Sequence, residues 1–444
     1  MVTPFVQSIL DTPLDATTKG VPVAAGTVRL GDVGKQGWNV LRGDMMTPLL
    51  VMRDGYLQNN LKVLRDFAEH HGVSTAPHGK SSFCPQLYLE QVEIGGSWGI
   101  TAATTHQVAV VAATGIKNIF IANEVIGRAN IEQLVALRHA YPGTAIYSLV
   151  DSAGTMDELR RHGGPKLNKG ERLPILLEVG VPGGRAGVRT FDQAAEMIDR
   201  IMGQGDIFDF AGIECYEGLV AKDTYEATMK EVDRLLALTV DVLMHANAKG
   251  AFQGREEVIL TAGGSAYFDR VVNHFKRANN VQGLRIILRG GSSLTYDHGV
   301  YRMQLEHMDK RNGFETDAGE ISALKAFKPA LEMMAGVVSL QDESVAIMNM
   351  GIRDLPYDLG YPLPLRQYRD GKQIGPLDGI APDWTIAKSN DQHCYMHYPK
   401  GADIAVGDTF AFGISHPCTA FDKWKVLFRV DDAFNVTGAL KTFF

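Results

Sequence analysis

From about residue 48 to residue 288 the chain alternates short apolar runs with amphipathic stretches, and this alternation restricts its fold more than any other feature. Such a pattern is typical of βα units arranged around a parallel sheet. The predicted strands are 48–53, 73–76, 99–103, 118–122, 144–150, 173–179, 210–216, 258–262 and 284–288. Their number and spacing favour a (β/α)8 barrel of the TIM type.

Two helices between these strands are clear from the sequence. A helix is predicted over 54–72, with Asp54 as its N-cap, a face of leucines and Gly72 at its end. A longer helix of the same kind is predicted over 223–250. Both agree with the helical half of βα units.

The sequence changes character after residue 288, where glycine and proline separate short alternating runs. This pattern predicts a mainly antiparallel β domain. We therefore expect three parts: an N-terminal segment over 1–40 that packs with the β domain, a barrel over 41–298, and the β domain over 299–444.

Composition excludes several classes of protein. The 444 residues carry a net charge of -7 without a basic tract, so nucleic acid and anionic membranes are poor partners. The four cysteines form no CxxC pair and are expected to be reduced thiols. With no apolar signal region or run of 18 apolar residues, we expect a cytoplasmic enzyme without a membrane segment.

Lys80 is the first candidate site residue, because it follows a predicted strand in TAPHGKSSFCP. A lysine held by apolar neighbours, with His78 two positions earlier, can have its pKa lowered enough to form a Schiff base. This suggests an aldehyde cofactor. A solvated lysine is the commoner meaning of such a position, so the assignment depends on the other motifs.

Two glycine-rich turns, LTAGGSAYF and LRGGSSLTY, follow two late strands. Glycine lets the backbone approach a ligand, and the N–H groups and serine hydroxyls can hold an anion as phosphate sites in barrels do. Ordinary tight turns are the alternative. Together with Lys80, the turns suggest pyridoxal 5'-phosphate, bound through Gly263, Gly264, Ser265, Gly291, Ser292 and Ser293.

Arg185 and Tyr216 also follow predicted strands. Since the carboxyl ends of barrel strands meet at one mouth, we expect both side chains to lie near Lys80. The Arg185 guanidinium could face the pyridine nitrogen of the cofactor and keep it unprotonated, bind a carboxylate, or lie on the surface. We predict roles in catalysis and cofactor binding for both residues.

His416 and Cys418 lie two positions apart in ISHPCTAF and suit zinc, with manganese as an alternative. The alternative to a metal site is a histidine and a buried thiol that only pack in the core. Two ligands are too few for a structural zinc site, so an open, catalytic site is predicted. His393 and His397 could line the same pocket or lie on the surface.

These motifs, in this order, resemble fold-type III pyridoxal-phosphate enzymes of the D-threonine aldolase and D-serine dehydratase group, whose barrel is similar to that of alanine racemase. The resemblance runs from about Thr47 and includes TPLLV, PHGK, the element carrying Arg185, Tyr216-Glu217-Gly218, both glycine turns, Tyr296-Asp297, the DQH of 391–393 and the HPC of 416–418. It implies that Lys80 binds the cofactor and that His416 and Cys418 bind the metal.

Within the group, His-x-Cys resembles the dehydratases, whereas aldolases usually show His-x-Asp. The sequence around Lys80, APHGKSSFCPQL, departs from the RPHxKTHK of the group and more closely resembles bacterial proteins labelled amino acid deaminase. We therefore predict a dehydratase for D-β-hydroxy amino acids such as D-serine or D-threonine, working as a homodimer. Retro-aldol cleavage, racemisation and non-catalytic cofactor binding are the alternatives.

Overall fold

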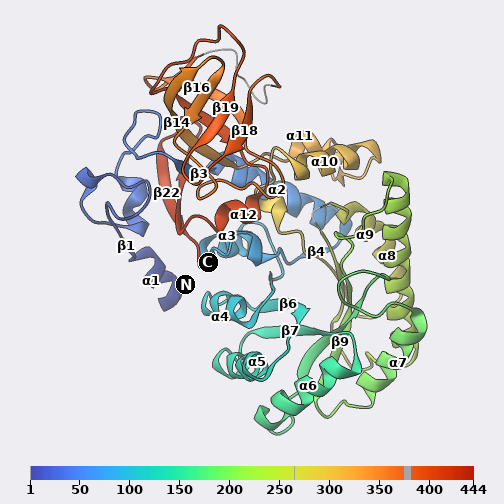
Figure 1. Ribbon diagram of the computed structural model, residues 1–444. Coiled ribbons are helices and arrows are strands. Elements are labelled where there is room, and N and C mark those ends of the chain that lie inside the picture. The colour runs from blue at the N-terminus through green and yellow to red at the C-terminus, as the bar shows by residue number, and fades with distance from the viewer. Residues whose placement is uncertain (1, 265, 375–381) are drawn as a thin grey trace.

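The computed structural model describes residues 2–264, 266–374 and 382–444, and its larger half is an eight-stranded parallel sheet that curls into a barrel (Figure 1). The strand order is β4-β11-β10-β9-β8-β7-β6-β5. The strands are β4 (Ser74–Thr75), β5 (Ile100–Ala102), β6 (Asn118–Glu124), β7 (Ala145–Val150), β8 (Leu173–Val179), β9 (Phe208–Cys215), β10 (Val258–Ala262) and β11 (Leu284–Leu288).

Backbone hydrogen bonds join the two ends of this sheet. Trp98 N–H donates to the Thr75 carbonyl at 2.8 Å, and Thr101 N–H donates to the Pro77 carbonyl at 3.0 Å. The predicted barrel is thus confirmed, together with its mouth at the carboxyl ends of the strands.

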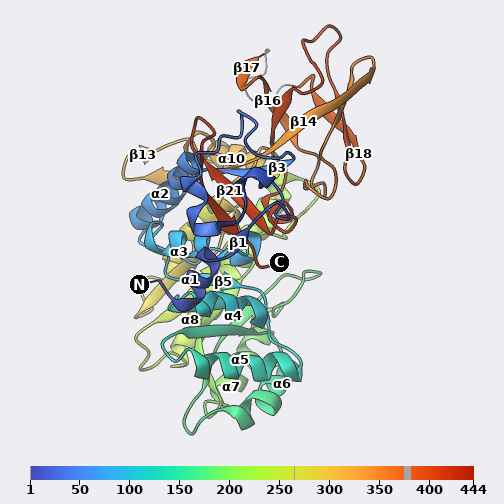
Figure 2. The same ribbon diagram turned by 90° about the vertical axis from the view of Figure 1, so that its left-hand side faces the viewer.

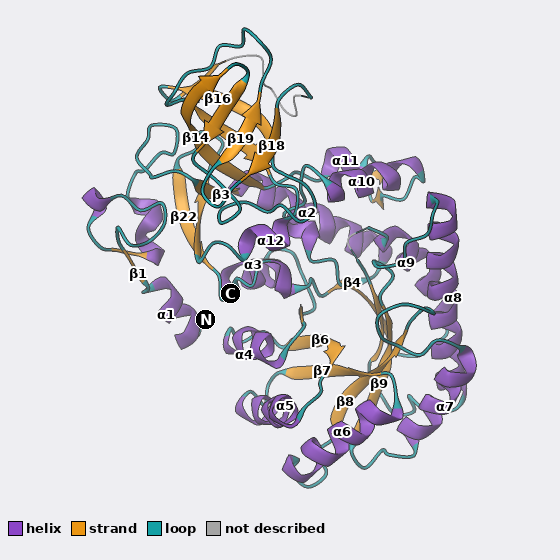
Figure 3. Ribbon diagram, viewed as in Figure 1, coloured by secondary structure: helices purple, strands orange, loops and turns teal. Residues whose placement is uncertain are grey.

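Helices cover the outside of the barrel (Figure 3). They are α3 (Pro85–Glu93), α4 (Thr105–Ala113), α5 (Arg128–Ala140), α6 (Ala153–Gly163), α7 (Phe191–Met202), α8 (Tyr225–Ala248) and α9 (Phe268–Phe275). The predicted helix over 223–250 corresponds to α8, and its N-cap is Thr224, whose hydroxyl accepts from Ala227 N–H.

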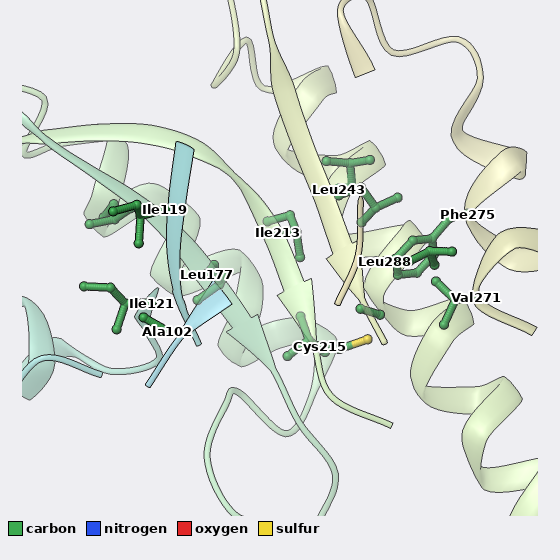
Figure 4. Close-up of a cluster of buried hydrophobic side chains, with 14 of the residues drawn as sticks. Ala102, Ile119, Ile121, Leu177, Ile213, Cys215, Leu243, Val271, Phe275 and Leu288 are labelled. Carbon is green, nitrogen blue, oxygen red and sulfur yellow. The ribbon is translucent and has the colours of Figure 1, made fainter. Parts of the chain in front are cut away.

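The barrel core has two layers because successive strand residues face opposite sides of the sheet. Ile119 and Ile121 of β6 point outward and belong to the apolar cluster between the sheet and the surrounding helices (Figure 4). Phe120, between them, points inward and packs with Leu149, Leu176 and Ile259. Both clusters are apolar, as the continuous hydrophobic runs in the sequence require, and buried polar residues such as Glu178 and Glu214 lie near the carboxyl ends of the strands.

The second part of the chain is a mainly antiparallel β domain, as predicted (Figure 2). Its strands are β14 (Leu331–Asp342), β15 (Val345–Met348), β16 (Leu363–Arg369), β17 (Lys372–Ile374), β18 (Thr385–Ser389), β19 (Cys394–His397), β20 (Thr409–Gly413), β21 (Val426–Val430) and β22 (Val436–Lys441). A short helix, α12 (Pro417–Phe421), lies where this domain meets the barrel (Figure 1).

The prediction that 48–53 is a barrel strand is wrong. This segment forms β3 (Leu49–Arg53), which pairs antiparallel with β14 and parallel with β21 in the sheet of the β domain. All five residues are buried. An apolar run followed directly by a helix shows that a strand is present, but not which sheet receives it.

The helix after β3 is α2 (Asp54–His71), and Gly72 ends it in the left-handed conformation, as predicted. Asp54 is not its N-cap. The Asp54 carboxylate instead accepts hydrogen bonds from Arg429 Nε and Thr437 Oγ1, both at 2.5 Å. These two partners lie in the β domain, so α2 is tied at its start to the β sheet.

The N-terminal segment contains α1 (Pro4–Leu10), β1 (Pro13–Leu14) and β2 (Val28–Arg29). Its apolar residues pack with strands of the β domain. The shared cluster includes Ile9, Val21, Leu30, Val33, Met334, Ala411 and Phe428.

Helices also occur where only β structure was predicted. They are α10 (Val300–Lys310) and α11 (Ala323–Ala326), with the hairpin of β12 (Glu315–Thr316) and β13 (Gly319–Glu320) between them. Asp297 explains the start of α10, because one of its carboxylate oxygens accepts from the N–H groups of Gly299 and Tyr301 at 2.8 and 3.0 Å. Among the described residues, no helix is long and apolar enough to cross a membrane.

Candidate active site

A cavity of about 430 Å³ opens at the carboxyl ends of the barrel strands, where α12 approaches from the β domain. It brings together most of the predicted site residues. They are His78, Lys80, Arg185, Tyr216, Gly263, Gly264, Gly291, Ser292, His416 and Cys418. Ser293 lies deeper, and its hydroxyl donates to the Gly290 carbonyl at 2.7 Å, whereas Ser265 lies outside the described residues.

Lys80 lies in a short turn of 3₁₀ helix, η3 (Gly79–Ser81), directly after β4. Its side chain opens into the cavity. Partial burial lowers the pKa of the Lys80 amine, and the positive charges of Arg185 and Arg289 lower it further, against the opposing effect of Cys418. A lysine with a lowered pKa is more often an unprotonated amine and hence a better nucleophile.

His78 holds the backbone of this turn, since its Nδ1 accepts from the Lys80 N–H at 3.4 Å. Burial lowers the pKa of His78 well below its ordinary value, and the charges of Lys80 and Arg289 act in the same direction. His78 is therefore a neutral imidazole that supports the lysine.

Arg185 and Tyr216 contact each other in the wall of the same cavity. The Arg185 guanidinium carbon lies 5.3 Å from the centre of the Tyr216 ring, in a cation–π contact. Burial raises the pKa of Tyr216, and the neighbouring Glu217 raises it further, so the phenol stays protonated. Arg185 makes no ion pair within the described part of the chain, which leaves its charge available to an anionic ligand.

The first glycine turn is held by a residue that the sequence did not reveal as a site residue. Glu217, fully buried, accepts from Gly263 N–H at 3.0 Å and from Gly264 N–H at 2.7 Å. These two N–H groups, which we expected to hold a phosphate, are therefore directed at a carboxylate. The turn lines the cavity, but Glu217 determines its shape.

The second glycine turn approaches the lysine segment closely. A Cβ atom on Gly291 would lie 2.6 Å from the His78 carbonyl oxygen and 2.7 Å from Ser81 Oγ, so only glycine fits there. Ser292 follows in η6 (Ser292–Leu294) and is hydrogen-bonded to the side chains of Tyr301 and Cys418. The turn thus connects the cofactor side of the cavity with the His-x-Cys segment.

Arg289 is a second site residue that the sequence analysis missed. Its Nη2 donates to Glu214 at 2.5 Å and to the Cys215 carbonyl at 2.9 Å, and its Nε donates to Thr261 Oγ1 at 2.9 Å. The guanidinium also lies over the Phe120 ring, 4.9 Å from its centre. Arg289 is thus a buried cation, fixed from several directions, in the wall of the cavity.

Carboxyl groups lie below this arginine inside the barrel. Burial raises the pKa of Glu178, and the nearby Glu214 and Glu124 raise it further because like charges repel. Burial also raises the pKa of Glu214, against the attraction of Arg289. None of these acids lines the cavity, and no acidic residue does so within the described chain.

His416 and Cys418 face the same cavity from the start of α12. Burial alone would lower the pKa of His416, but hydrogen bonds with Cys418 and Asp358 outweigh it and raise the pKa to about 9. Burial would raise the pKa of Cys418, yet His416, Ser81 and Ser292 lower it. Cys418 Sγ lies 3.3 Å from Ser81 Oγ, next to Lys80 in the chain.

His393 and His397 do not line this cavity. Both are exposed in the hairpin of β18 and β19, away from the barrel mouth. In the described ranges no cluster of three or more histidine, cysteine, aspartate or glutamate side chains is arranged to hold a metal ion. A metal bound by His416 and Cys418 would keep coordination positions for water or substrate.

The residues present fit a phosphate-bearing aldehyde and a divalent metal. The cavity offers a lysine amine with a lowered pKa, a turn that only glycine can form, serine hydroxyls, and cationic walls without a lining acid. The Cys418 thiol, whose pKa is lowered, and the His416 imidazole are borderline-soft donors that suit zinc. Lys80, the second glycine turn and the cationic residues would hold the aldehyde, and His416 and Cys418 the metal.

Comparisons with known proteins show what this chain is similar to in sequence and in fold. The model of the putative serine dehydratase domain matches residues 330–430. The 3-hydroxy-D-aspartate aldolase of Paracoccus denitrificans (strain Pd 1222) is 25% identical over 321 residues, which cover 72% of this chain and 75% of the relative.

The chain is similar in sequence to these proteins and in fold to solved relatives. The crystal structure of D-threonine aldolase from Filomicrobium marinum matches with a TM-score of 0.69 at 22% identity, covering 91% of this chain and 97% of that one. D-threo-3-hydroxyaspartate dehydratase from Delftia sp. HT23 matches with a TM-score of 0.68 at 19% identity, covering 91% and 99%. The predicted resemblance and the alanine racemase-like fold are confirmed. The relatives are named as aldolases and dehydratases, in agreement with the predicted lyase class.

Proposed function

We propose that this protein is a pyridoxal 5'-phosphate- and metal-dependent dehydratase that converts D-β-hydroxy amino acids, such as D-serine or D-threonine, to a 2-keto acid and ammonia. One observation carries the proposal: a single cavity is lined both by Lys80, with its lowered pKa, and by His416 and Cys418. A nucleophilic amine and a pair of metal donors therefore face the same ligand.

Each part of the cavity has a task in this reaction. When bound, the cofactor supplies an electron sink and the metal supplies Lewis acidity at the β-hydroxyl of the substrate. Lys80, once its amine is free, removes the proton from the substrate α-carbon. Tyr216 and the buried Arg289 fix the cavity wall, and Arg185 offers its unpaired charge to an anionic group.

The closing of the cavity by α12 gives the reaction a partly enclosed site. Cys418 and Ser292 bridge the β domain to the second glycine turn, so donors from both parts of the chain are held together. Such positioning removes the entropy loss of bringing two reacting groups together.

We also propose that the protein is a homodimer. Light scattering during size-exclusion chromatography tests this proposal.

Retro-aldol cleavage to glycine and an aldehyde is the second candidate. The observation that favours it is the match to a 3-hydroxy-D-aspartate aldolase over most of both chains. Both reactions use the same cofactor and metal donors, and they differ in whether the β-hydroxyl leaves or loses its proton. The geometry of the two donors serves either reaction.

A product assay on purified protein loaded with pyridoxal 5'-phosphate and Zn²⁺ separates the two. D-Serine and D-threonine are supplied, each with and without a metal chelator, and L-serine is the stereochemical control. Keto acid and ammonia that disappear with the chelator support the dehydratase. Glycine and acetaldehyde from D-threonine establish the aldolase instead, and an absence of both product pairs contradicts the proposal.

A further inference from the structure

His416 has a partner that the sequence motifs do not include. Asp358 lies in the 349–362 loop between β15 and β16, and its Oδ2 is 2.6 Å from His416 Nδ1. The other carboxylate oxygen of Asp358, Oδ1, accepts from Thr419 Oγ1, also at 2.6 Å. Both oxygens of the Asp358 carboxylate are therefore hydrogen-bonded to side chains of the 416–419 segment.

This carboxylate leaves one nitrogen of His416 for a metal. An imidazole that donates from Nδ1 to a carboxylate presents Nε2 as its remaining ligand atom, and the hydrogen bond fixes both the tautomer and the ring orientation. The side chains of His416 and Cys418 are also hydrogen-bonded to each other. The imidazole and the thiol therefore lie next to each other in the wall of the cavity.

Asp358 is itself held to α12 by its loop. Ser415 Oγ donates to the Gly360 carbonyl at 2.5 Å, and Trp424 Nε1 donates to the Asp354 carbonyl at 2.8 Å. The 349–362 loop is thus hydrogen-bonded to the chain on both sides of the His-x-Cys segment, at Ser415 and at Trp424. The attachment of the loop to this part of the chain does not depend on the Asp358 side chain alone, so replacing that side chain should leave the loop in place.

From this geometry we propose that Asp358 is a positioning residue for the metal site: it orients His416 so that Nε2 and Cys418 Sγ bind one divalent ion. The inference rests on the proposed function, because it requires His416 and Cys418 to be metal ligands. Asp358 is not proposed as a third ligand, since the described residues contain no cluster of three suitable donors. Thr419 supports it by holding the second carboxylate oxygen.

The test is the affinity of the cofactor-loaded protein for Zn²⁺, measured by competition with a chromophoric chelator. Removing an outer partner of a metal-bound histidine typically weakens binding by about 10–100-fold. We expect Asp358→Asn and Asp358→Ala to raise the Kd of Zn²⁺ by this factor. Thr419→Val should raise the Kd by less, because Asp358 keeps its contact with His416.

Asp422→Asn is the matched control. Asp422 lies at the end of the same helix with a side chain as exposed as that of Asp358, 42% against 41%, but it makes no hydrogen bond to His416. Its replacement removes the same charge close to the site. We expect the Kd of Zn²⁺ to stay near that of the unmodified protein.

Absorption of Co²⁺ bound in place of zinc gives a second measurement, because its visible bands report ligand geometry. We expect Asp358→Asn to change these bands and Asp422→Asn to leave them as they are. If Zn²⁺ affinity depends on His416 but is the same in Asp358→Asn, the inference is wrong while the metal site stands. If His416→Ala binds Zn²⁺ as tightly as the unmodified protein, the metal part of the proposed function is wrong, and the inference with it.

Discussion

The two sides of the cavity are built differently. The cofactor side, which comprises Lys80, the two glycine turns and Arg289, belongs to the barrel and rests on buried contacts. The metal side, which comprises Asp358, His416 and Cys418, belongs to the β domain, and Asp358 has a side chain 41% exposed to solvent. The barrel thus places the amine through buried contacts, whereas a partly solvent-exposed contact orients the metal donors.

The largest effect should come from the lysine of the cofactor side. We expect Lys80→Ala to remove the visible imine absorbance of the cofactor-loaded protein and to lower turnover by about 10³-fold or more, because no other lysine of the described residues lines the cavity. Absorption spectra and product assays measure both. Lys169→Ala, at an exposed lysine outside the cavity, should change neither. Retention of the absorbance in Lys80→Ala would contradict the assignment.

Breaking the buried ion pair between Arg289 and Glu214, on the cofactor side, should have the next largest effect. Arg289→Ala leaves the Glu214 carboxyl buried without its partner, and such a loss typically destabilises by about 3–5 kcal/mol. Chemical denaturation of the cofactor-free protein measures it. Arg128→Ala, which breaks an exposed pair with Glu132, should cost less than about 1 kcal/mol.

A double mutant tests whether the pair is the cause. Arg289→Met combined with Glu214→Gln removes both charges, so it should be more stable than Arg289→Met alone. Equal stability of the single and double mutants would mean that packing against Phe120, rather than the uncompensated charge, accounts for the loss.

On the cofactor side, the sequence predicted that Lys80 and both glycine turns meet at one cavity, but not that the Gly263 and Gly264 N–H groups bind Glu217. The strand runs located the barrel mouth, and the glycine turns and Lys80 follow those strands directly. Glu217 and Arg289 were missed because a charged residue beside a strand end looks the same in sequence whether it faces water or a buried partner. β3 was placed in the wrong sheet for a related reason, since its apolar run carries no information on pairing.

The metal side was predicted only in part. His416 and Cys418 are recognisable from their spacing, but Asp358 lies 58 residues before His416, in a loop without regular structure. Contacts of this kind depend on how β15, β16 and α12 are arranged in space. They cannot be derived from local patterns, which report secondary structure and short-range turns.

A third prediction concerns close packing on the cofactor side. In Gly291→Ala the new methyl group meets the His78 carbonyl oxygen at 2.6 Å, and since this is backbone, the lysine segment must shift. Overpacking of this kind typically costs about 1–3 kcal/mol. We expect that loss in denaturation and weaker binding of pyridoxal 5'-phosphate in a titration of the imine absorbance. Gly55→Ala is the control, because its methyl group would have only Asp432 Oδ1 nearby, at 3.8 Å.

The smallest effect on stability should come from the metal side. Asp358→Asn keeps the shape of the side chain and removes a charge that is partly exposed, and ion pairs of this exposure are typically worth about 0–1 kcal/mol. We therefore expect denaturation of the metal-free protein to show a loss below about 1 kcal/mol, several times smaller than that of Arg289→Ala. A loss as large as that of Arg289→Ala would overturn the comparison, because the 349–362 loop would then be part of the rigid frame. A small loss of stability with a large loss of metal affinity would mean that this side of the cavity is organised for binding the ion and contributes little to the fold.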